Sequence, residues 1–328
     1  MIISRTPFRV SFFGGGTDYP GWYRDNGGAV LSTTIDKYCY LACRHMPPFF
    51  DVRYRVVYSR IELANSIEEI EHPSVRACLD HLGFSDQRME IVHYADLPSR
   101  TGIGSSSSCT VGLQSVLSAL KGRMLSKWEL ARLAIEVEQD VLKETVGSQD
   151  QVSAAFGGFN LIRFDDRGFH VQPVTVSRSR LQQLQDNLLL VYTGISRVAA
   201  EVATEQVRNI SQKADELRRM RVLVDVAVEV LTSDRDLAEF GRLLHESWMI
   251  KATLSSRITN PMIQDVYARA TAAGALGGKL LGAGGGGFML FYVDRDRRDA
   301  VSESLRGLLQ VPFQFEDAGS QLIYYQPN

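Results

Sequence analysis

The sequence has few cysteines, no excess of either charge and no long apolar run. Its four cysteines lack paired metal-binding spacings and are too few for a disulfide scaffold, so a reducing cytoplasm is the expected compartment. No apolar run reaches the roughly 18 residues that a membrane span requires, and the first ten residues lack an apolar signal region with a cleavage site. The formal charge of −2 gives no electrostatic reason to expect a nucleic-acid partner. We therefore expect a cytoplasmic protein with neither membrane nor nucleic-acid partners.

The composition is that of an ordinary globular protein, with 45% hydrophobic and 23% charged residues. The length of 328 residues exceeds what one core usually supports, so two domains or one large two-part fold are expected. Strand-like and helical stretches alternate irregularly rather than as repeated βαβ units, which predicts an α+β fold. We place the boundary so that the first domain covers 1–185 and the second covers 186–328.

Local patterns predict the individual elements. Ser126 and Glu129 form a capping box at the start of an amphipathic helix over 126–142. Further helices are expected over 73–83, 105–123, 198–250 and 296–309. The β-branched and aromatic stretches predict a strand pair over 29–46 and strands over 54–59, 89–98, 187–194 and 321–325, with a strand, glycine loop and strand over 279–294.

The stretch "LPSRTGIGSSSSC" at 97–109 places two glycines and four serines before a helical pattern. A helix N-terminus presents unpaired N–H groups and a partial positive charge, and glycines upstream allow a phosphate to approach the backbone. The stretch is not a Walker A loop, because no Lys-Ser/Thr pair follows the glycines. A phosphate cradle and a serine-rich helix cap are equally supported by this stretch alone.

The stretch "GAGGGG" at 282–287 matches the G-x-G-x-x-G pattern of dinucleotide-binding loops. That interpretation requires a helix after the loop, whereas "FMLFYVD" follows and is strand-like. The remaining interpretation is a tight loop between two strands. Its glycines would allow either the close approach of a ligand or close packing against a phosphate loop.

A third glycine-rich stretch, "RTPFRVSFFGGGTDYPGWY", covers 5–23. Arg9, Ser11 and Phe13 lie on one side of the strand that precedes the glycines. Asp18 follows them, where an Asx-turn is the simplest structural explanation. Three such segments in one chain indicate a polyanionic ligand that is approached from several sides.

These segments, in this order and over essentially the whole length, resemble the three motifs of the GHMP small-molecule kinases, the group of galactokinase, homoserine kinase and mevalonate kinase. The resemblance implies a mixed N-terminal sheet with helices and a ferredoxin-like C-terminal part. It also implies an ATP-dependent sugar kinase that requires Mg²⁺ and binds a small sugar phosphate. Oligomeric state stays open, with a homodimer as one option.

The resemblance also implies roles for individual residues. Ser106 and Glu138 would hold Mg²⁺, Asp150 in "GSQDQ" would lie beside the reacting hydroxyl, and Arg9 would stabilise negative charge there. The residues implied to bind the ATP phosphates are Gly102, Ile103, Gly104, Ser105, Ser106 and Ser107. The residues implied to contact the substrate are Gly15, Gly16, Thr17, Asp18, Gly284 and Gly285. Each role has a simpler rival: Glu138 as solvated helix surface, Asp150 as a helix cap, and Arg9 as one half of an ion pair.

The first motif departs from galactokinases, which have Glu-His where this chain has Gly15-Gly16, so galactose is disfavoured. "TGISRVAAEV" and "ITNPMIQDVYARATAAGALGGKLLGAGGGGF" resemble the D-glycero-D-manno-heptose 7-phosphate kinases. This implies phosphorylation of the anomeric hydroxyl to a 1,7-bisphosphate, for nucleotide-activated heptose synthesis. The candidates for binding the distal phosphate are Arg24, Arg53, Arg197 and Lys251. The alternatives are a kinase of free fucose or mannose and a catalytically silent sugar- or nucleotide-binding regulator.

Overall fold

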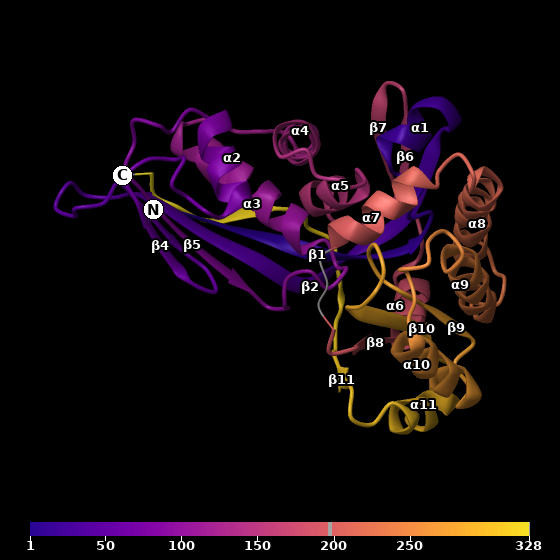
Figure 1. Cartoon of the computed structure of the whole chain (residues 1–328). Helices are drawn as coiled ribbons and strands as arrows, with labels where there is room; N and C mark the ends of the chain where they lie inside the picture. Colours follow the sequence, from indigo (N-terminus) through magenta and orange to yellow (C-terminus); the bar gives the residue numbers. More distant parts are fainter. Residues whose placement is uncertain (196–198, 328) are drawn as a thin grey trace.

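Two β-sheets and the helices packed on them organise the protein (Figure 1). The computed structural model describes residues 1–195 and 199–327. Within these residues the first sheet has nine strands along the path β13-β1-β2-β5-β3-β4, with β6 and β12 also paired to β2 and β7 paired to β6. Its strands are β1 (Ile2–Phe13), β2 (Gly28–His45), β3 (Tyr54–Val57), β4 (Ile61–Ala64), β5 (Met89–Ala95), β6 (Phe159–Asp165), β7 (Gly168–Pro173), β12 (Phe315–Glu316) and β13 (Gln321–Tyr325).

The second sheet is smaller and antiparallel along the path β11-β8-β10-β9. Its strands in the described residues are β8 (Leu188–Tyr192), β9 (Gly277–Leu280), β10 (Phe288–Tyr292) and β11 (Leu309–Gln310). The two sheets with their helices confirm the predicted two-part α+β fold.

Helices cover both sheets, and α3 and α5 pack on β1 and β2 (Figure 1). In the first part they are α1 (Pro20–Asn26), α2 (Pro73–His81), α3 (Ser105–Leu120), α4 (Lys127–Glu136), η1 (Val137–Val141) and α5 (Gln149–Phe156). In the second part they are α6 (Arg178–Asp186), α7 (Ala199–Arg208), α8 (Ala214–Thr232), α9 (Ala238–Lys251), α10 (Pro261–Ala272), η2 (Arg295–Arg297) and α11 (Arg298–Ser304).

The stretch 29–46 forms the single long strand β2, so the prediction of a strand pair is wrong. Its first half pairs with β6 from Gly28 to Thr33, and its second half pairs with β5 from Cys39 to His45. No glycine or proline interrupts the middle of the stretch to make a turn. The strand therefore continues across the sheet and changes its partner along the way.

The predicted helix over 126–142 changes its geometry before it ends. Ser126 and Glu129 form the expected capping box, and α4 runs from Lys127 to Glu136. A π-helical turn, η1, then spans Val137–Val141 and carries Glu138. π-Helical turns within helices often occur at functional sites.

The end of the chain returns to the first sheet. β12 pairs with β2 and β13 pairs with β1, and the backbone N–H of Gln326 donates to the carbonyl oxygen of Met1. The two termini therefore lie side by side (Figure 1). β8 begins at Leu188, near the predicted boundary at 185, which stays a prediction because the first sheet includes strands from the last part of the chain.

One hydrophobic core extends through both parts. The ring of Phe12 on β1 stacks on that of Phe159 on β6, and it meets the edge of Phe240 on α9 at a centroid distance of 5.4 Å. Phe13 meets Phe240 in the same way at 5.0 Å. These contacts fix the second part against the strand that carries Arg9.

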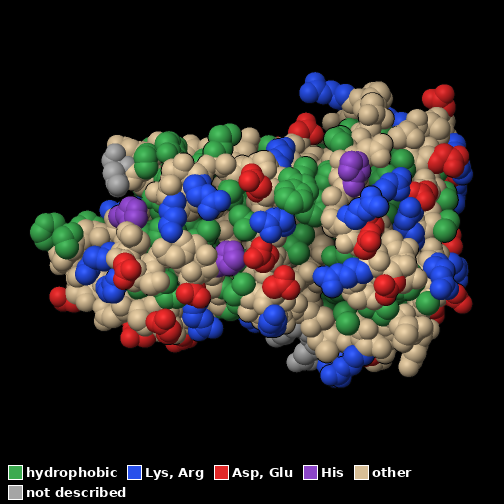
Figure 2. Space-filling view, turned by 90° about the horizontal axis from the view of Figure 1, so that it is seen from above, with side chains coloured by type: hydrophobic (Ala, Val, Ile, Leu, Met, Phe, Trp, Pro, Cys, Tyr) green, Lys and Arg blue, Asp and Glu red, His purple; other side chains and the backbone are tan. Residues whose placement is uncertain are grey.

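The surface carries both charges, and acidic and basic side chains are interspersed on the face seen in Figure 2. Among the described residues, no helix combines the length and the apolar character that crossing a bilayer would need.

Candidate active site

A cleft of about 1370 Å³ lies where the three glycine-rich segments meet. Its lining includes Gly15 from the first segment, Gly104 from the second and Gly282 from the third, together with Arg9 and Asp150. The structure thus brings together segments that are far apart in the sequence.

The second glycine-rich segment forms a loop that ends at the N-terminus of α3. Gly104 caps this helix in the left-handed conformation, at φ 75° and ψ 25°. Arg100, a non-glycine residue, is also left-handed at φ 62°, a conformation that costs energy for a side-chain-bearing residue. The first N–H groups of a helix have no intrahelical partner. The loop and the first turn of α3 therefore present donors to the cleft, which supports the interpretation as a phosphate cradle.

The third glycine-rich segment packs directly against this loop. A Cβ on Gly102 would lie 2.4 Å from the carbonyl oxygen of Leu281, and one on Gly282 would lie 2.3 Å from the Cα of Gly102. A Cβ on Gly287 would likewise lie 2.2 Å from the carbonyl oxygen of Thr101. The contact requires glycine on both sides, which confirms close packing as one reason for the glycine run.

Gly284 and Gly285 lie farther along the third segment. The backbone N–H of Gly285 donates to the carbonyl oxygen of Ile258, and a Cβ on Gly284 would lie 2.7 Å from the Cα of Ile258. Among the described residues that line the cleft, the segment is represented by Gly282 and Ala283. The structure therefore gives Gly284 and Gly285 a packing role, and their predicted contact with substrate stays a prediction.

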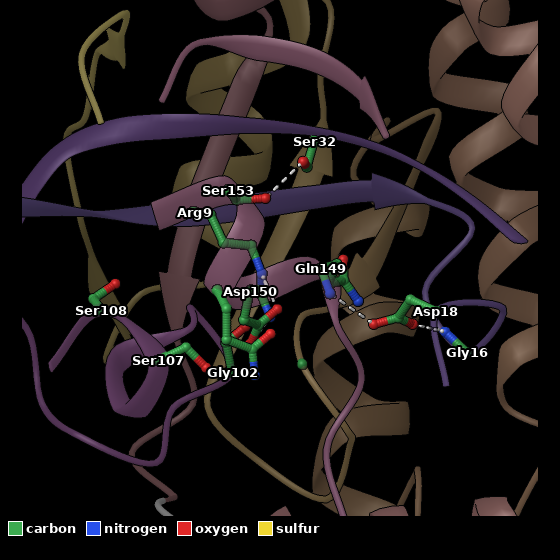
Figure 3. Close-up of polar contacts among 12 residues, drawn as sticks. Arg9, Gly16, Asp18, Ser32, Gly102, Ser107, Ser108, Gln149, Asp150 and Ser153 are labelled. Carbon is green, nitrogen blue, oxygen red and sulfur yellow. Dashed lines mark hydrogen bonds and ion pairs between the residues drawn. The ribbon is translucent and has the colours of Figure 1, made fainter. Parts of the chain in front are cut away.

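Arg9 and Asp150 point toward one another beside the loop (Figure 3). The Arg9 guanidinium donates from Nε to Asp150 Oδ1 and from Nη2 to Oδ2, both at 2.8 Å, and from Nη1 to the carbonyl oxygen of Gly102 at 2.6 Å. Arg9 is buried, whereas the side chain of Asp150 is 25% exposed. The pair thus holds a partly accessible carboxylate next to the loop, and Asp150 lies in the first turn of α5.

Glu138 lies fully buried in η1, so it is not solvated helix surface. Its Oε2 accepts hydrogen bonds from Ser107 Oγ at 2.9 Å and from the Gln151 amide. Its Oε1 has no hydrogen-bond partner among the described residues. Burial raises the pKa of Glu138 to about 7. A buried carboxylate oxygen without a partner, beside a hydroxyl, fits a hard divalent cation such as Mg²⁺.

The serine that contacts Glu138 is Ser107, one residue after the predicted Ser106. Ser106 is exposed and lines the cleft together with Ser105. Ser108 is buried and donates to the carbonyl oxygen of Pro7, which ties α3 to β1. Ser106 as a metal ligand stays a prediction, and sequence spacing did not indicate Ser107 for that role.

Asp18 is buried and lies beside Gln149 and Gly16 (Figure 3). Its Oδ1 accepts from the backbone N–H of Gly16 at 2.8 Å, and its Oδ2 accepts from that of Gln149 at 3.4 Å. Burial raises the pKa of its carboxyl group. The Thr17 hydroxyl donates to the carbonyl oxygens of Gly14 and Ala29. Thr17 thus has a structural role in the turn, while Gly15, Gly16 and Asp18 line the cleft.

Two buried lysines lie near these carboxylates. Lys251 at the end of α9 lines the cleft and donates to the carbonyl oxygen of Leu280 at 3.1 Å and to that of Gly282. Burial lowers its pKa to about 8. Lys279 on β9 donates to the carbonyl oxygen of Phe12 at 2.8 Å, and burial lowers its pKa well below the ordinary value. Sequence reasoning missed Lys279, although a lone lysine in an apolar strand was a visible signal.

The other candidates for the distal phosphate lie elsewhere. Arg24 is exposed on α1, and Arg53 donates to the carbonyl oxygen of Ser85. Neither is among the residues lining the cleft, and Arg197 lies outside the described residues. Of the candidates that the structure describes, Lys251 alone lines the cleft.

Comparisons with known proteins agree with this geometry. Two family models match the chain: GHMP kinases N terminal domain over residues 62–158 and GHMP kinases C terminal over residues 226–309. A Campylobacter jejuni protein named D-glycero-alpha-D-manno-heptose 7-phosphate kinase is 28% identical, with 93% of each chain covered. An L-fucokinase/L-fucose-1-P guanylyltransferase of Bacteroides fragilis is 25% identical over 92% of this chain, which spans about a third (35%) of that protein.

A solved structure of a D-glycero-D-manno-heptose 1-phosphate kinase from Bacteriodes thetaiotaomicron superimposes with a TM-score of 0.77. That protein is 26% identical, and the superposition covers 99% of this chain and all of that one. The matched family models, these relatives and the three glycine-rich segments around one cleft agree: the chain belongs to the GHMP kinase family.

Proposed function

We propose that this kinase transfers the γ-phosphoryl group of ATP to the anomeric hydroxyl of D-glycero-D-manno-heptose 7-phosphate, giving the 1,7-bisphosphate. The observation that carries the proposal is the Arg9–Asp150 pair, which holds a partly exposed carboxylate beside the phosphate loop. The similarity over nearly the full length to the Campylobacter jejuni heptose 7-phosphate kinase supports the choice of sugar.

Phosphoryl transfer needs positioning and charge stabilisation more than covalent chemistry. The loop from Gly102 to Ser107 would bind the ATP phosphates through backbone N–H groups and the dipole of α3. Glu138 and Ser107 are the residues we propose to hold Mg²⁺, which when bound neutralises charge on the phosphates. Ser106, with its exposed hydroxyl at the cleft, is the second candidate serine.

Asp150 would orient the anomeric hydroxyl and accept its proton. Arg9 donates to both oxygens of Asp150 and so fixes the carboxylate beside the loop. An anomeric hydroxyl is more acidic than an ordinary alcohol, so a carboxylate suffices as its base. Arg9 would also stabilise the negative charge that develops on the attacking oxygen, and Asp18 would accept hydrogen bonds from sugar hydroxyls.

Lys251 is the residue we propose for recognising the phosphate already on the sugar. Its ammonium group lies close enough to Arg9, Asp18 and Asp150 for their charges to shift its pKa. Two backbone carbonyls hold it in place. A bound phosphate dianion would offset the cost of keeping this buried cation charged.

The test is ADP release with Mg²⁺ across a sugar panel of the heptose 7-phosphate, the free heptose, mannose, fucose and galactose. We expect a strong preference for the phosphorylated heptose, with the new phosphate on the anomeric carbon by ³¹P NMR. Lys251→Met should remove most of that preference, whereas Arg24→Met, at an exposed position outside the cleft, should not. Faster turnover of free fucose or mannose would refute the substrate. No turnover of any sugar, with ATP still bound, would instead support a silent regulator.

A further inference from the structure

A group of two cysteines and one histidine lies beside the phosphate loop and has no role in the proposed reaction. Cys39 on β2 pairs with Ala95 on β5, and Leu41 pairs with His93. Because side chains alternate along a strand, Cys39 and His93 project from the same face of the sheet as diagonal neighbours. α3 packs on β2 and brings Cys109 to them.

The three side chains are close enough to share one ion. One ligand atom from each, the two Sγ atoms and an imidazole nitrogen, lies within 4.8 Å of the other two. Bonds of zinc to sulfur are about 2.3 Å long and bonds of zinc to imidazole nitrogen about 2.0–2.1 Å, so a tetrahedral zinc site places its ligand atoms about 3.6–3.8 Å apart. Small side-chain rotations therefore suffice to close the site.

The donor set selects the kind of ion. Two thiolates and an imidazole suit Zn²⁺ and similar borderline-soft cations, whereas Mg²⁺ prefers oxygen ligands such as those at Glu138. The two kinds of site are therefore chemically distinct although both border the same cleft.

The site is open to the cleft on one side. His93 and Cys109 line the cleft, while Cys39 is fully buried beneath them. Three protein ligands leave a fourth tetrahedral position for water or for a group on a bound ligand. Cys109 follows Ser105 by four residues on α3, so the two lie on one face of the helix, a single turn apart. An ion at this site would therefore lie next to the phosphate loop.

We propose that Cys39, His93 and Cys109 bind a borderline-soft divalent cation such as Zn²⁺ at the wall of the nucleotide cleft. Binding replaces the two thiol protons, which leave to solvent, with two metal–sulfur bonds and one metal–nitrogen bond. The inference does not rest on the identity of the sugar, and it would stand if the proposed substrate were wrong.

Co²⁺ titration of the reduced, oxygen-free protein tests the site without measuring activity. Tetrahedral cobalt bound by thiolates gives intense visible bands and sulfur-to-metal charge-transfer bands, which oxygen ligands at Glu138 would not give. We expect these bands to saturate at one Co²⁺ per chain and to disappear when Zn²⁺ is added. Cys109→Ser and His93→Gln should each weaken binding by at least about tenfold.

Cys43→Ser is the matched control, because Cys43 is buried on the same strand face but lies outside the three-residue group. It should keep the cobalt spectrum, and thermal unfolding of each variant checks that it is folded. His93 is only partly buried, so its substitution gives a result even if Cys109→Ser does not fold. The absence of thiolate–cobalt bands in the native chain, or their equal loss in Cys43→Ser, would overturn the proposal. A Cys39–Cys109 disulfide that persists under reducing conditions would overturn it too.

Discussion

Replacing Asp150 by asparagine separates the chemical role of this carboxylate from its structural role. The change removes the negative charge that faces Arg9, whose two hydrogen bonds to Asp150 are both 2.8 Å long. Removing one partner of a fully buried ion pair costs about 3–5 kcal/mol. Because Asp150 is 25% exposed and an asparagine oxygen still accepts one hydrogen bond, we expect the free energy of unfolding to fall by only about 1–2 kcal/mol.

The rate should respond more strongly than the stability does. A lost general base costs about 10²–10⁴ in turnover, and we expect a loss near 10² because an anomeric hydroxyl is more acidic than an ordinary alcohol and depends less on its base. Initial rates of ADP release measure the loss of turnover, and urea unfolding measures the loss of stability.

The double variant Arg9→Met/Asp150→Asn distinguishes the two roles. It removes the buried guanidinium together with its partner, so it should be about 1–2 kcal/mol more stable than the sum of the single changes predicts. Its turnover should not recover, since neither the base nor the cation is present. Strict additivity in urea would show that the pair has no structural coupling. A rate of Asp150→Asn within about tenfold of the native rate would show that Asp150 does not act on the hydroxyl.

Three further changes test the surroundings of this pair. Burial lowers the pKa of Lys251 from 10.5 to about 8, so between these pH values the folded state binds fewer protons than the unfolded chain does. The free energy of unfolding should therefore rise with pH across that window. Lys251→Met should remove up to about 3 kcal/mol of this rise, as measured by urea unfolding. Gly147→Ala places a Cβ 1.9 Å from Asp18 Oδ2, so kcat/KM for the sugar should fall while KM for ATP changes little. Glu138→Gln should lower turnover at saturating Mg²⁺ and ATP by at least about 10², and calorimetry should show weaker binding of the magnesium–nucleotide complex.

Much of the fold followed from local patterns, and the exceptions depended on tertiary contacts. The capping box at Ser126 involves residues three positions apart, and the structure confirms it. The single long strand β2 was missed because its continuity depends on two partners, β5 and β6, from distant parts of the chain. The return of β13 to β1 likewise depends on pairing between the two ends of the sequence.

At the site, residue types were easier to predict than their contacts. The motifs identified the glycine-rich segments and the carboxylates that meet at the cleft. They did not indicate that Ser107 contacts Glu138, because that depends on where α3 begins and on the π-helical turn that carries Glu138. Nor could spacing show that the Thr17 hydroxyl serves the turn rather than a substrate, because it donates to the carbonyl oxygen of Ala29 on β2, which is distant in sequence.

The close packing of the second and third glycine-rich segments leads to a last prediction, for which the chain offers a matched control glycine. Gly102 and Gly122 both have left-handed backbones, at φ 84° and 69°, so alanine at either position carries a similar conformational cost of about 1–2 kcal/mol. A Cβ at Gly122 meets no atom within 4 Å, whereas one at Gly102 lies 2.4 Å from the Leu281 oxygen. Any loss of stability in Gly102→Ala beyond that in Gly122→Ala therefore measures the packing of the two loops against each other.

We expect Gly122→Ala to lose only that conformational cost and to keep its affinity for ATP. Gly102→Ala should lose more stability and should bind ATP at least about tenfold more weakly, because the third segment must move away from the loop that cradles the phosphates. Thermal unfolding and equilibrium binding of a fluorescent ATP analogue measure the two effects. Equal losses in both variants would mean that the loops can separate without disturbing the phosphate site, and that the glycines at their contact serve only the turns in which they lie.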